Sequence, residues 1–324
     1  MVPLGKGKKM ENNKHKTVFE NIDEAQLYLY RQLLSCGEKI STRDMNTLEL
    51  FPVYFSIKNP RARITTLKGR NWKFAPALGE VVWHLSGSKD VGFISEYLSN
   101  WKNFSEDKQQ ITGSCYGFKM FEKDSLTGRS RWNDIVNLLR NDRYSRRAVI
   151  SLLDPSEEID SYKLDISCTI SLQFLVRNEK LDLIVNMRSN DLVWGLPYDF
   201  FLFSYLQEFM AAELEIQLGN YHHFTASLHL YEKHFELAKR VIERNSGSLG
   251  LIMPKVPNGA FDVLVQGEQK LRSGEMKLEE LSLSEMNGYW KDLLKVLYFH
   301  HFDKDKQSSE LEEFRQGSIY RDLI

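Results

Sequence analysis

Charged and polar side chains gather at a few points of the sequence where they could bind and act on an anionic substrate. The arginine pair at 146 and 147 and the Arg-Ser step at 188 and 189 offer guanidinium groups, whose rigid fork matches phosphate oxygens. Arginines near Cys168 would stabilise its thiolate, which could act as a nucleophile. The ordinary alternatives are a buried cysteine and a solvent-exposed arginine pair. The candidates are Arg146, Arg147, Cys168, Arg188, Ser189, Asn190, Asp191, Asp199, His229 and Tyr231.

A further candidate, for proton chemistry, is Glu80. Apart from Glu80 and His84, the segment from Phe74 to Leu85 is almost wholly apolar, which predicts a buried helix that ends near Gly87. A carboxylate inside such a helix costs free energy unless it has a partner. The alternative is a glutamate at the edge of the helix that reaches water.

The strands that must position these residues are visible as alternating apolar patterns. Alternation predicts a half-buried strand at 51–57, another strand at 147–153, and a hairpin at 168–188 that turns at 177–180. In the second arm of the hairpin, every other residue from 181 to 187 is Leu, Val or Met. This arm therefore indicates a sheet with one face in the core.

Helical spacing predicts the remaining elements. Asp23 is expected to cap a first helix, whose apolar stripe includes Leu27 and Leu33. Residues 199–218 predict a helix that ends at Gly219, and residues 228–245 predict another. Residues 289–299 carry one more helix-like pattern in the C-terminal part.

Composition excludes several classes of function. The chain has 324 residues, of which 42% are hydrophobic, enough for a sizeable core. Its 43 lysines and arginines nearly balance its 44 aspartates and glutamates, for a net charge of -1. We therefore expect neither nucleic acid nor an acidic membrane as a partner, and any phosphate recognition must be local.

The cysteines and histidines indicate a reducing compartment and no metal site. Cys36, Cys115 and Cys168 are too few and too scattered for a disulfide framework, and no CxxC pair suggests zinc. The adjacent histidines at 222–223 and 300–301 diverge on a strand or a helix alike, so we assign no metal. No apolar run reaches the roughly 18 residues of a membrane helix, and no signal peptide is apparent. We expect a cytoplasmic protein.

The chain is expected to form one α+β domain in which helices pack on a mixed sheet. Residues 1–16 are basic, apolar-poor and without periodicity, which indicates a flexible leader. Residues 17–245 carry the regular patterns, and residues 246–324 predict a C-terminal extension packed on the same domain. Neither an internal repeat nor a linker rich in Pro, Gly or Ser divides the chain.

Four motifs in order give the sequence a resemblance to a known family. They are ITTLKGRNWKFAPALGEVVWHLSG at 64–87, SRRAVIS at 145–151, the run from SCTISLQF to WGLPYD at 167–199, and SLHLYEKH at 227–234. From about residue 43 to 234 the chain resembles the thymidylate synthase family, whose members modify pyrimidine nucleotides. The resemblance implies the family fold and a homodimer formed through the sheet.

Position by position, the resemblance implies a role for each candidate. Cys168 would add to carbon 6 of the pyrimidine, and Glu80 would organise water and proton transfer around the base. Tyr116 matches an active-site tyrosine. The implied nucleotide ligands are Arg43, Arg146, Arg147, Arg188, Ser189, Asn190, Asp191, Asp199, His229 and Tyr231, with Arg146 and Arg147 supplied by the second subunit. The implied contacts to the cosubstrate 5,10-methylenetetrahydrofolate are Trp101, Asp191, Trp194, Gly195 and Tyr198.

The implied reaction has a branch point. Thiolate addition at carbon 6 makes carbon 5 nucleophilic enough to attack the one-carbon unit of the folate. Loss of tetrahydrofolate leaves an exocyclic methylene on the ring. Hydride from the folate would give a methyl group, whereas water would give a hydroxymethyl group.

Asp199 decides which substrate the sequence favours. Thymidylate synthases have an asparagine there, whose amide matches the hydrogen-bonding edge of uracil. A carboxyl group can accept from the amino group of cytosine while sharing a proton with the ring nitrogen. Asp199 is also a feature of the cytidylate and deoxycytidylate hydroxymethylases of the family. The alternative is an aspartate that caps the helix starting at Phe200.

Other departures alter the surroundings of the site. Ser167 and Thr169 replace the proline and histidine that usually flank the cysteine, and Lys102 and Phe104 replace an aspartate and a tryptophan. The sequence therefore predicts a hydroxymethyltransferase acting on CMP or dCMP. The alternatives are a thymidylate synthase that methylates dUMP and a catalytically silent member that binds a nucleotide or a protein. The choice between ribose and deoxyribose and the role of Ile324 stay open.

Overall fold

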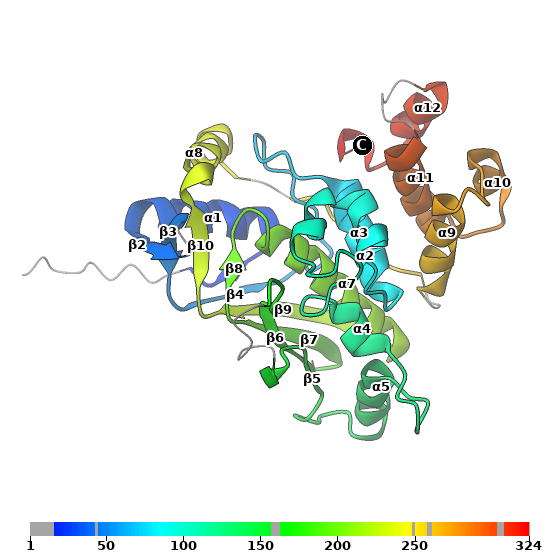
Figure 1. Ribbon diagram of the computed structural model, residues 1–324, viewed down its shortest axis with the longest axis horizontal. Coiled ribbons are helices and arrows are strands. Elements are labelled where there is room, and N and C mark those ends of the chain that lie inside the picture. The colour runs from blue at the N-terminus through cyan, green and yellow to red at the C-terminus, as the bar shows by residue number, and fades with distance from the viewer. Residues whose placement is uncertain are drawn as a thin grey trace, which may run out of the picture.

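Two β-sheets and a set of packed helices make up the molecule (Figure 1). The computed structural model describes residues 16–42, 45–156, 163–247, 250–257, 261–302 and 308–323. The larger sheet has the order β1-β4-β9-β7-β6-β5, and the smaller sheet has the order β2-β3-β10-β8. Both contain parallel and antiparallel pairs, which confirms the predicted α+β class with a mixed sheet.

The strands of the larger sheet are β1 (Val18–Phe19), β4 (Val53–Ile57), β5 (Val149–Ser151), β6 (Thr169–Arg177), β7 (Lys180–Met187) and β9 (Gln217–Thr225). Those of the smaller sheet are β2 (Glu38–Thr42), β3 (Met45–Leu50), β8 (Asn190–Asp191) and β10 (Leu228–Tyr231).

The helices are α1 (Ile22–Cys36), α2 (Phe74–Leu85), α3 (Val91–Tyr97), α4 (Tyr116–Phe121), α5 (Arg131–Asn141), α7 (Leu196–Glu213), α8 (Phe235–Arg244), α9 (Asp262–Arg272), α10 (Leu278–Leu283), α11 (Gly288–Phe302) and α12 (Ser309–Gly317). Short 3₁₀ segments are η1 (Ser99–Asn103), η2 (Glu232–His234) and η3 (Arg321–Leu323).

The β6–β7 hairpin confirms the predicted hairpin and its turn. Arg177 pairs with Lys180, and the two residues between them, Asn178 and Glu179, have φ angles of 50° and 59°. Two consecutive positive φ angles give the turn the twist that suits adjacent antiparallel strands. The pairing register shifts between Thr169 and Ser171, close to Cys168.

The buried helix α7 lies against one face of the larger sheet and in turn supports α2. Most of its residues are buried, from Leu196 to Ala211, because it contacts β7 and β9 on one side and α2 on the other. The predicted helix at 74–85 is confirmed with the same bounds in α2. This layer therefore holds Glu80 of α2 and Asp199 of α7 on neighbouring helices.

Two predicted helices were wrong in part, because β-pairing overrides local helical spacing. The helix predicted at 199–218 ends at Glu213, and the residues around Gly219 form β9 instead. Gly219 is not a helix stop: its backbone passes so close to Asp182 that a Cβ would lie 2.1 Å from the carboxylate oxygen. The helix predicted at 228–245 begins as strand β10, and only α8 is helical as expected.

Smaller corrections concern element ends. Asn21, not Asp23, caps α1 by accepting from the backbone N–H of Glu24 at 2.9 Å. Asp23 instead accepts from the N–H of Thr66 at 3.0 Å. The strand predicted at 147–153 covers only β5, and the one predicted at 51–57 begins at Val53.

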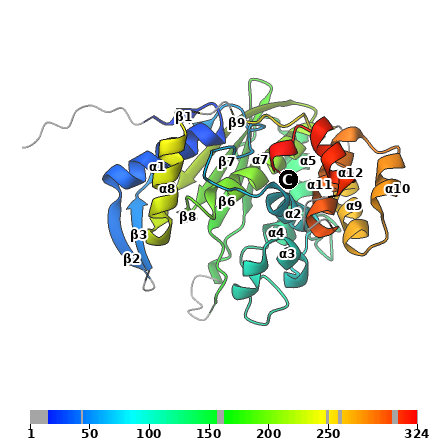
Figure 2. The same cartoon turned by 90° about the horizontal axis from the view of Figure 1, so that it is seen from above.

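The C-terminal helices pack against α2 and α3 at one end of the molecule (Figure 2). The helix-like pattern at 289–299 is confirmed within α11. After α12 the chain returns toward α2, where Tyr320 stacks on Phe74 with ring centroids 4.8 Å apart. Across the described residues, no helix is long and apolar enough to cross a bilayer.

Candidate active site

Cys168 lies at the open end of the β6–β7 hairpin, opposite its turn. It directly precedes β6, and its carbonyl accepts from the backbone N–H of Arg188, which directly follows β7, at 2.9 Å. Strand β10 then brings His229 alongside Asp191 of β8. Strand pairing alone therefore gathers four of the predicted site residues at one end of the sheets.

The Arg188 guanidinium braces the cysteine. Its Nε donates to the carbonyl of Ser167 at 2.9 Å, and its Nη2 donates to the carbonyl of Ile166 at 3.0 Å. The same Nη2 lies 3.8 Å from Cys168 Sγ. A cation at this position would stabilise a negatively charged sulfur. Nη1 is the nitrogen that these contacts leave for an anionic ligand.

Glu80 and Asp199 are two carboxyl groups whose pKa values are both raised. Burial, and then the charge of Asp199, raises the pKa of Glu80 from 4.5 to about 8. Burial, and then the charge of Asp191, raises the pKa of Asp199 from 3.8 to about 7, although a hydrogen bond from Asn190 Nδ2 at 2.7 Å opposes this. Both residues are half-buried and not fully enclosed in the core. Near neutral pH this pair holds at least one proton that can be exchanged.

Asp199 does not cap its helix, so the helix-cap alternative is wrong. Helix α7 begins at Leu196 with Gly195 as its N-cap, and Asp199 lies inside the first turn with its carboxylate on the Asn190 amide. A Cβ at Gly195 would lie 2.8 Å from the nitrogen of that amide. Glycine is required here because the loop closes directly over Asn190.

Tyr116 faces both the cysteine and the carboxyl pair. It is 5% exposed at the start of α4, and its hydroxyl accepts from the N–H of Thr169 at 3.3 Å. Burial, and then the negative charges of Cys168 and Asp199, raises the pKa of Tyr116 above its ordinary value. The phenol therefore stays protonated beside Cys168.

His229 and Tyr231 point to the same side of β10, with ring centroids 5.1 Å apart in an edge-to-face arrangement. Burial lowers the pKa of His229, while the nearby Asp191 and Glu49 oppose the shift. A neutral imidazole beside a phenol suits hydrogen bonding to a hydroxyl group of a ligand.

Three of the residues predicted to contact folate are aromatic, and each keeps part of its surface exposed. Trp101 on η1 packs on Trp83 at 5.3 Å. Tyr198 lies 5.9 Å from Trp72. Trp194 is 55% exposed, and its indole N–H donates to His234 Nε2 at 2.9 Å. These faces could pack against a planar ring.

The structure does not bring Arg146 and Arg147 to Cys168 of their own chain. Val149 pairs with Gln173, so Arg147 lies beside about residue 175, seven residues along β6 from Cys168. At about 3.3 Å per strand residue the separation is roughly 20 Å, beyond the reach of an arginine side chain. Both arginines are exposed, with Arg147 3.8 Å from Asp142. The predicted ligand Arg43 lies outside the described residues, as does Ile324, whose role the sequence left open.

Two residues near the site were missed by the sequence reasoning. Arg70 donates to the carbonyl of Val193 and thereby supports the loop before α7. His84 stacks on Tyr116. Both lie inside the motif at 64–87, but their contacts are with segments more than 30 residues away. Only their burial as polar residues in an apolar motif could have drawn attention to them.

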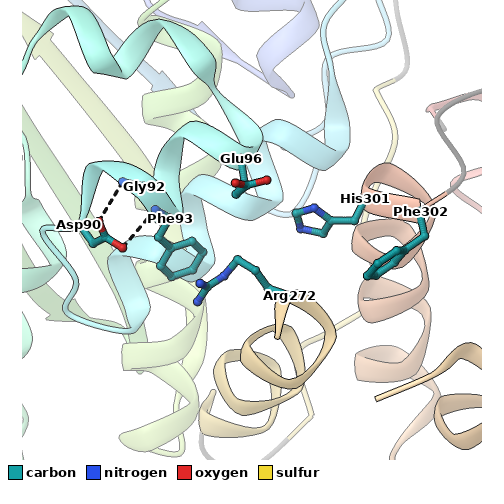
Figure 3. Close-up of a pocket in the computed structure, with 7 residues that line it drawn as sticks. All are labelled: Asp90, Gly92, Phe93, Glu96, Arg272, His301 and Phe302. Atoms are coloured by element: carbon teal, nitrogen blue, oxygen red, sulfur yellow. Dashed lines mark hydrogen bonds between the residues drawn. The ribbon is translucent and has the colours of Figure 1, made fainter. Parts of the chain in front are cut away.

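A separate cleft of about 350 Å³ lies away from these residues (Figure 3). It opens between α3 and the helices α9 and α11, and Phe93, Arg272 and His301 contribute to its walls. Within the part of the chain that the structure describes, no three His, Cys, Asp or Glu side chains gather as a metal site.

Comparison with known proteins identifies the family. Residues 25–262 match the sequence profile described as thymidylate synthase. The chain belongs to the thymidylate synthase family. A solved structure, thermostable thymidylate synthase A from Bacillus subtilis, shares the fold of this family member with a TM-score of 0.60 and 23% identity, over 70% of this chain and 86% of that one.

Curated relatives of this family member carry two different names. It is 35% identical over 216 residues to deoxyuridylate hydroxymethyltransferase of Bacillus phage SP01, covering 63% of this chain and 56% of the phage protein. It is 30% identical over 161 residues to the protein of the same name from Pseudomonas phage M6, covering 48% and 44%. The match thus spans about half the length of these two proteins. Thymidylate synthase of Buchnera aphidicola (subsp. Baizongia pistaciae) is 26% identical over 251 residues, 75% of this chain and 92% of that protein.

Proposed function

We propose that this protein transfers a one-carbon unit from 5,10-methylenetetrahydrofolate to carbon 5 of a cytosine nucleotide, CMP or dCMP, with water capture to give the 5-hydroxymethyl nucleotide. The observation that carries the choice of base is the half-buried Asp199 carboxyl, which is held by Asn190 and has a pKa raised to about 7. The hydroxymethyl outcome is supported by the names of the two phage relatives.

Base recognition follows from how Asp199 is held. Asn190 Nδ2 donates to one carboxylate oxygen, Oδ2, and so orients the group. Oδ1 can accept from the amino group of cytosine. At a pKa near 7 the carboxyl readily shares a proton with the bare ring nitrogen of the base.

The chemical step uses Cys168, Arg188 and Glu80. The Cys168 sulfur forms a bond to carbon 6, and the electron pair of the carbon 5–carbon 6 double bond moves into the ring, which makes carbon 5 nucleophilic. Arg188 stabilises the thiolate that begins this step. Glu80, with its pKa near 8, can hold a proton at neutral pH and pass it to or from the base through water.

The residues predicted to contact folate suit it on chemical grounds. Exposed or partly exposed rings at Trp101, Trp194 and Tyr198 offer faces for a planar heterocycle, and Asp191 supplies a carboxylate. Methylenetetrahydrofolate, when bound, would supply the one-carbon unit. Trp194 is positioned by its hydrogen bond to His234, so it can cover a ring without first becoming ordered.

A homodimer through the larger sheet completes the proposal. The face of this sheet opposite α7 carries Tyr54, Phe224, Ile184 and Val149, and strand register places them on one side. Tyr54 is 48% exposed and Phe224 is 37% exposed. A second copy packed there would cover this face, and Arg146 and Arg147 beside β5 could then reach the partner's nucleotide phosphate.

No disulfide joins the three cysteines, which suits a cytoplasmic enzyme.

A specific observation also favours a second candidate, hydroxymethylation of deoxyuridylate. This is the name of the two phage relatives. A protonated Asp199 could accept from the ring N–H of uracil and donate to its carbonyl, which the raised pKa permits. Methylation of dUMP and a catalytically silent role remain the further alternatives.

The deciding experiment incubates the protein with CMP, dCMP, UMP or dUMP and methylenetetrahydrofolate, and weighs the products. We expect a gain of one hydroxymethyl group on cytosine and no absorbance signal from dihydrofolate, because water capture leaves the folate unoxidised. A methylated uracil with stoichiometric dihydrofolate would refute the proposal.

The matched variant is Asp199→Asn, whose amide suits uracil. Asparagine can keep the contact to Asn190, so folding should be retained. A wrongly faced buried polar group costs about 1–3 kcal/mol, so the cytosine-to-uracil ratio of kcat/KM should fall roughly tenfold to a hundredfold. An unchanged ratio would show that Asp199 does not determine the base preference.

A further inference from the structure

His84 is a fully buried polar residue in the apolar motif of α2, and none of the chemistry above uses it. It follows Glu80 by four residues, so both side chains lie on one face of the helix. Its side chain is 0% exposed. The imidazole stacks on the ring of Tyr116 with centroids 5.4 Å apart and planes inclined by 11°.

A hydrogen bond fixes the orientation of the His84 imidazole in this stack. The backbone N–H of Gly117 donates to His84 Nδ1 at 3.1 Å. Nδ1 must therefore be unprotonated, and the proton of the neutral ring sits on Nε2. Burial lowers the pKa of His84 to about 3, so the ring keeps this form at every pH at which an enzyme of this kind would work.

The backbone of His84 also contacts the start of α4. A Cβ at Gly117 would lie 1.7 Å from the carbonyl oxygen of His84, so only glycine allows this approach. The first turn of α4 thus rests on His84 through both its main chain and its imidazole. Tyr116 is the first residue of that turn.

Tyr116 is held on its other sides as well. Phe203 of α7 lies 5.8 Å from its ring, and its hydroxyl accepts from Thr169, the residue after Cys168. A phenylalanine at position 84 could keep the stacking but not the Gly117 hydrogen bond. The polar contribution of His84 is therefore to set the position of the phenol relative to the cysteine.

We propose that His84 is a positioning residue that acts through Tyr116, holding the phenol hydroxyl beside Cys168 for thiolate addition and proton transfer. This inference rests on the proposed function of the same site. It assigns His84 no contact with the substrate and no proton of its own to transfer.

The test measures exchange of the carbon 5 hydrogen of a pyrimidine nucleotide into deuterated water, without folate. Reversible addition of Cys168 to carbon 6 labilises that hydrogen, so the exchange rate reports the step in which Tyr116 takes part. The variants are His84→Phe, Tyr116→Phe and the double variant, together with His84→Asn, whose side-chain oxygen can replace Nδ1 as acceptor. Nucleotide affinity is measured in parallel.

We expect His84→Phe to slow exchange about tenfold to a hundredfold, as small displacements of catalytic groups do, with nucleotide Kd changed less than about twofold. His84→Asn should recover part of the loss. In the Tyr116→Phe background, His84→Phe should have almost no further effect, because residues that act through one another are not additive. A purely structural role would give the same fold-loss in both backgrounds, and that result would overturn the proposal.

The control is His223→Phe on β9. His223 is another fully buried imidazole with a tyrosine partner, Tyr221, at 3.2 Å, and burial also lowers its pKa to about 3. The His223→Phe variant should have lower thermal stability but should not lose hydrogen exchange as His84→Phe does. If His84→Phe fails to fold, the same cycle run with His84→Asn decides between coupling and additivity. A parent protein that exchanges no pyrimidine nucleotide would instead refute the proposed function, and this inference with it.

Discussion

Replacing Glu80 by glutamine tests whether the Glu80 carboxyl holds a proton at neutral pH. Glutamine has nearly the same shape but cannot ionise. The parent carboxyl has its pKa raised from 4.5 to about 8, first by burial and then by the charge of Asp199. The variant removes this ionisation and leaves the helix α2 otherwise intact.

The sign of the stability effect follows from proton linkage. Below about pH 4.5 the folded and unfolded parent both carry a neutral acid, so parent and variant should be similar. Between 4.5 and 8 the unfolded chain releases the proton while the folded chain keeps it, so the parent loses stability as pH rises. The Glu80→Gln variant, which lacks this ionisation, should therefore gain stability relative to the parent across that window.

The size of the effect can be bounded. Each pKa unit corresponds to about 1.4 kcal/mol, so the full displacement gives an upper limit of roughly 5 kcal/mol. Because Glu80 keeps part of its surface exposed, solvent reduces this, and we expect about 1–3 kcal/mol at pH 8.5. For a chain of 324 residues that is roughly 1–5 °C in Tm.

The assay is thermal unfolding of the parent and Glu80→Gln between pH 4.5 and 8.5. Glu236→Gln, an exposed residue of α8 paired with Lys239, is the matched control and should follow the parent at every pH. The variant should also lose about 10²–10⁴ in kcat, the usual contribution of a proton-transfer group. Parallel curves of Tm against pH for parent and variant would refute the reasoning about Glu80.

Two further predictions address the nucleophile and the dimer. Cys168→Ala should abolish turnover and leave nucleotide binding largely intact, while Cys36→Ala and Cys115→Ala should stay active. Burial raises the pKa of Cys115 to about 11, which keeps it an inert thiol. Product release by Cys168→Ala near the parental rate would exclude covalent catalysis. Mixing Arg147→Ala and Cys168→Ala chains, each inactive alone, should restore up to about a quarter of parental activity, because half the dimers are mixed and each has one intact site. Mixtures that stay inactive after verified subunit exchange would show that the arginines do not act across an interface.

The local sequence pattern was enough to predict the elements that depend on residues close together in the sequence. Helix α2 and the β6–β7 hairpin were predicted with their bounds or turn, since a continuous apolar run and a two-residue turn are local properties. The family resemblance also named Cys168 and Glu80 before any geometry was known. The roles of the candidate site residues stay predictions that the experiments above test.

Long-range pairing decided what the local pattern got wrong. Residues 217–218 were predicted as the end of a helix but begin β9 and pair with Lys180 and Leu181 of β7, because satisfying the hydrogen bonds of a central strand outweighs local helical spacing. In the same way β10 pairs with β3 and β8, which carries His229 to Asp191.

The sequence by itself determined the chemistry available to this protein: a thiol, a glutamate in an apolar helix, arginines, and an aspartate where thymidylate synthases have an amide. Only the tertiary structure decided how these groups interact. The charge of Asp199 helps to raise the pKa of Glu80 because α2 and α7 pack side by side, and Arg147 lies far from its own Cys168 because strand register separates them. Proton affinity and reach depend on burial and distance, which a sequence specifies only through the fold.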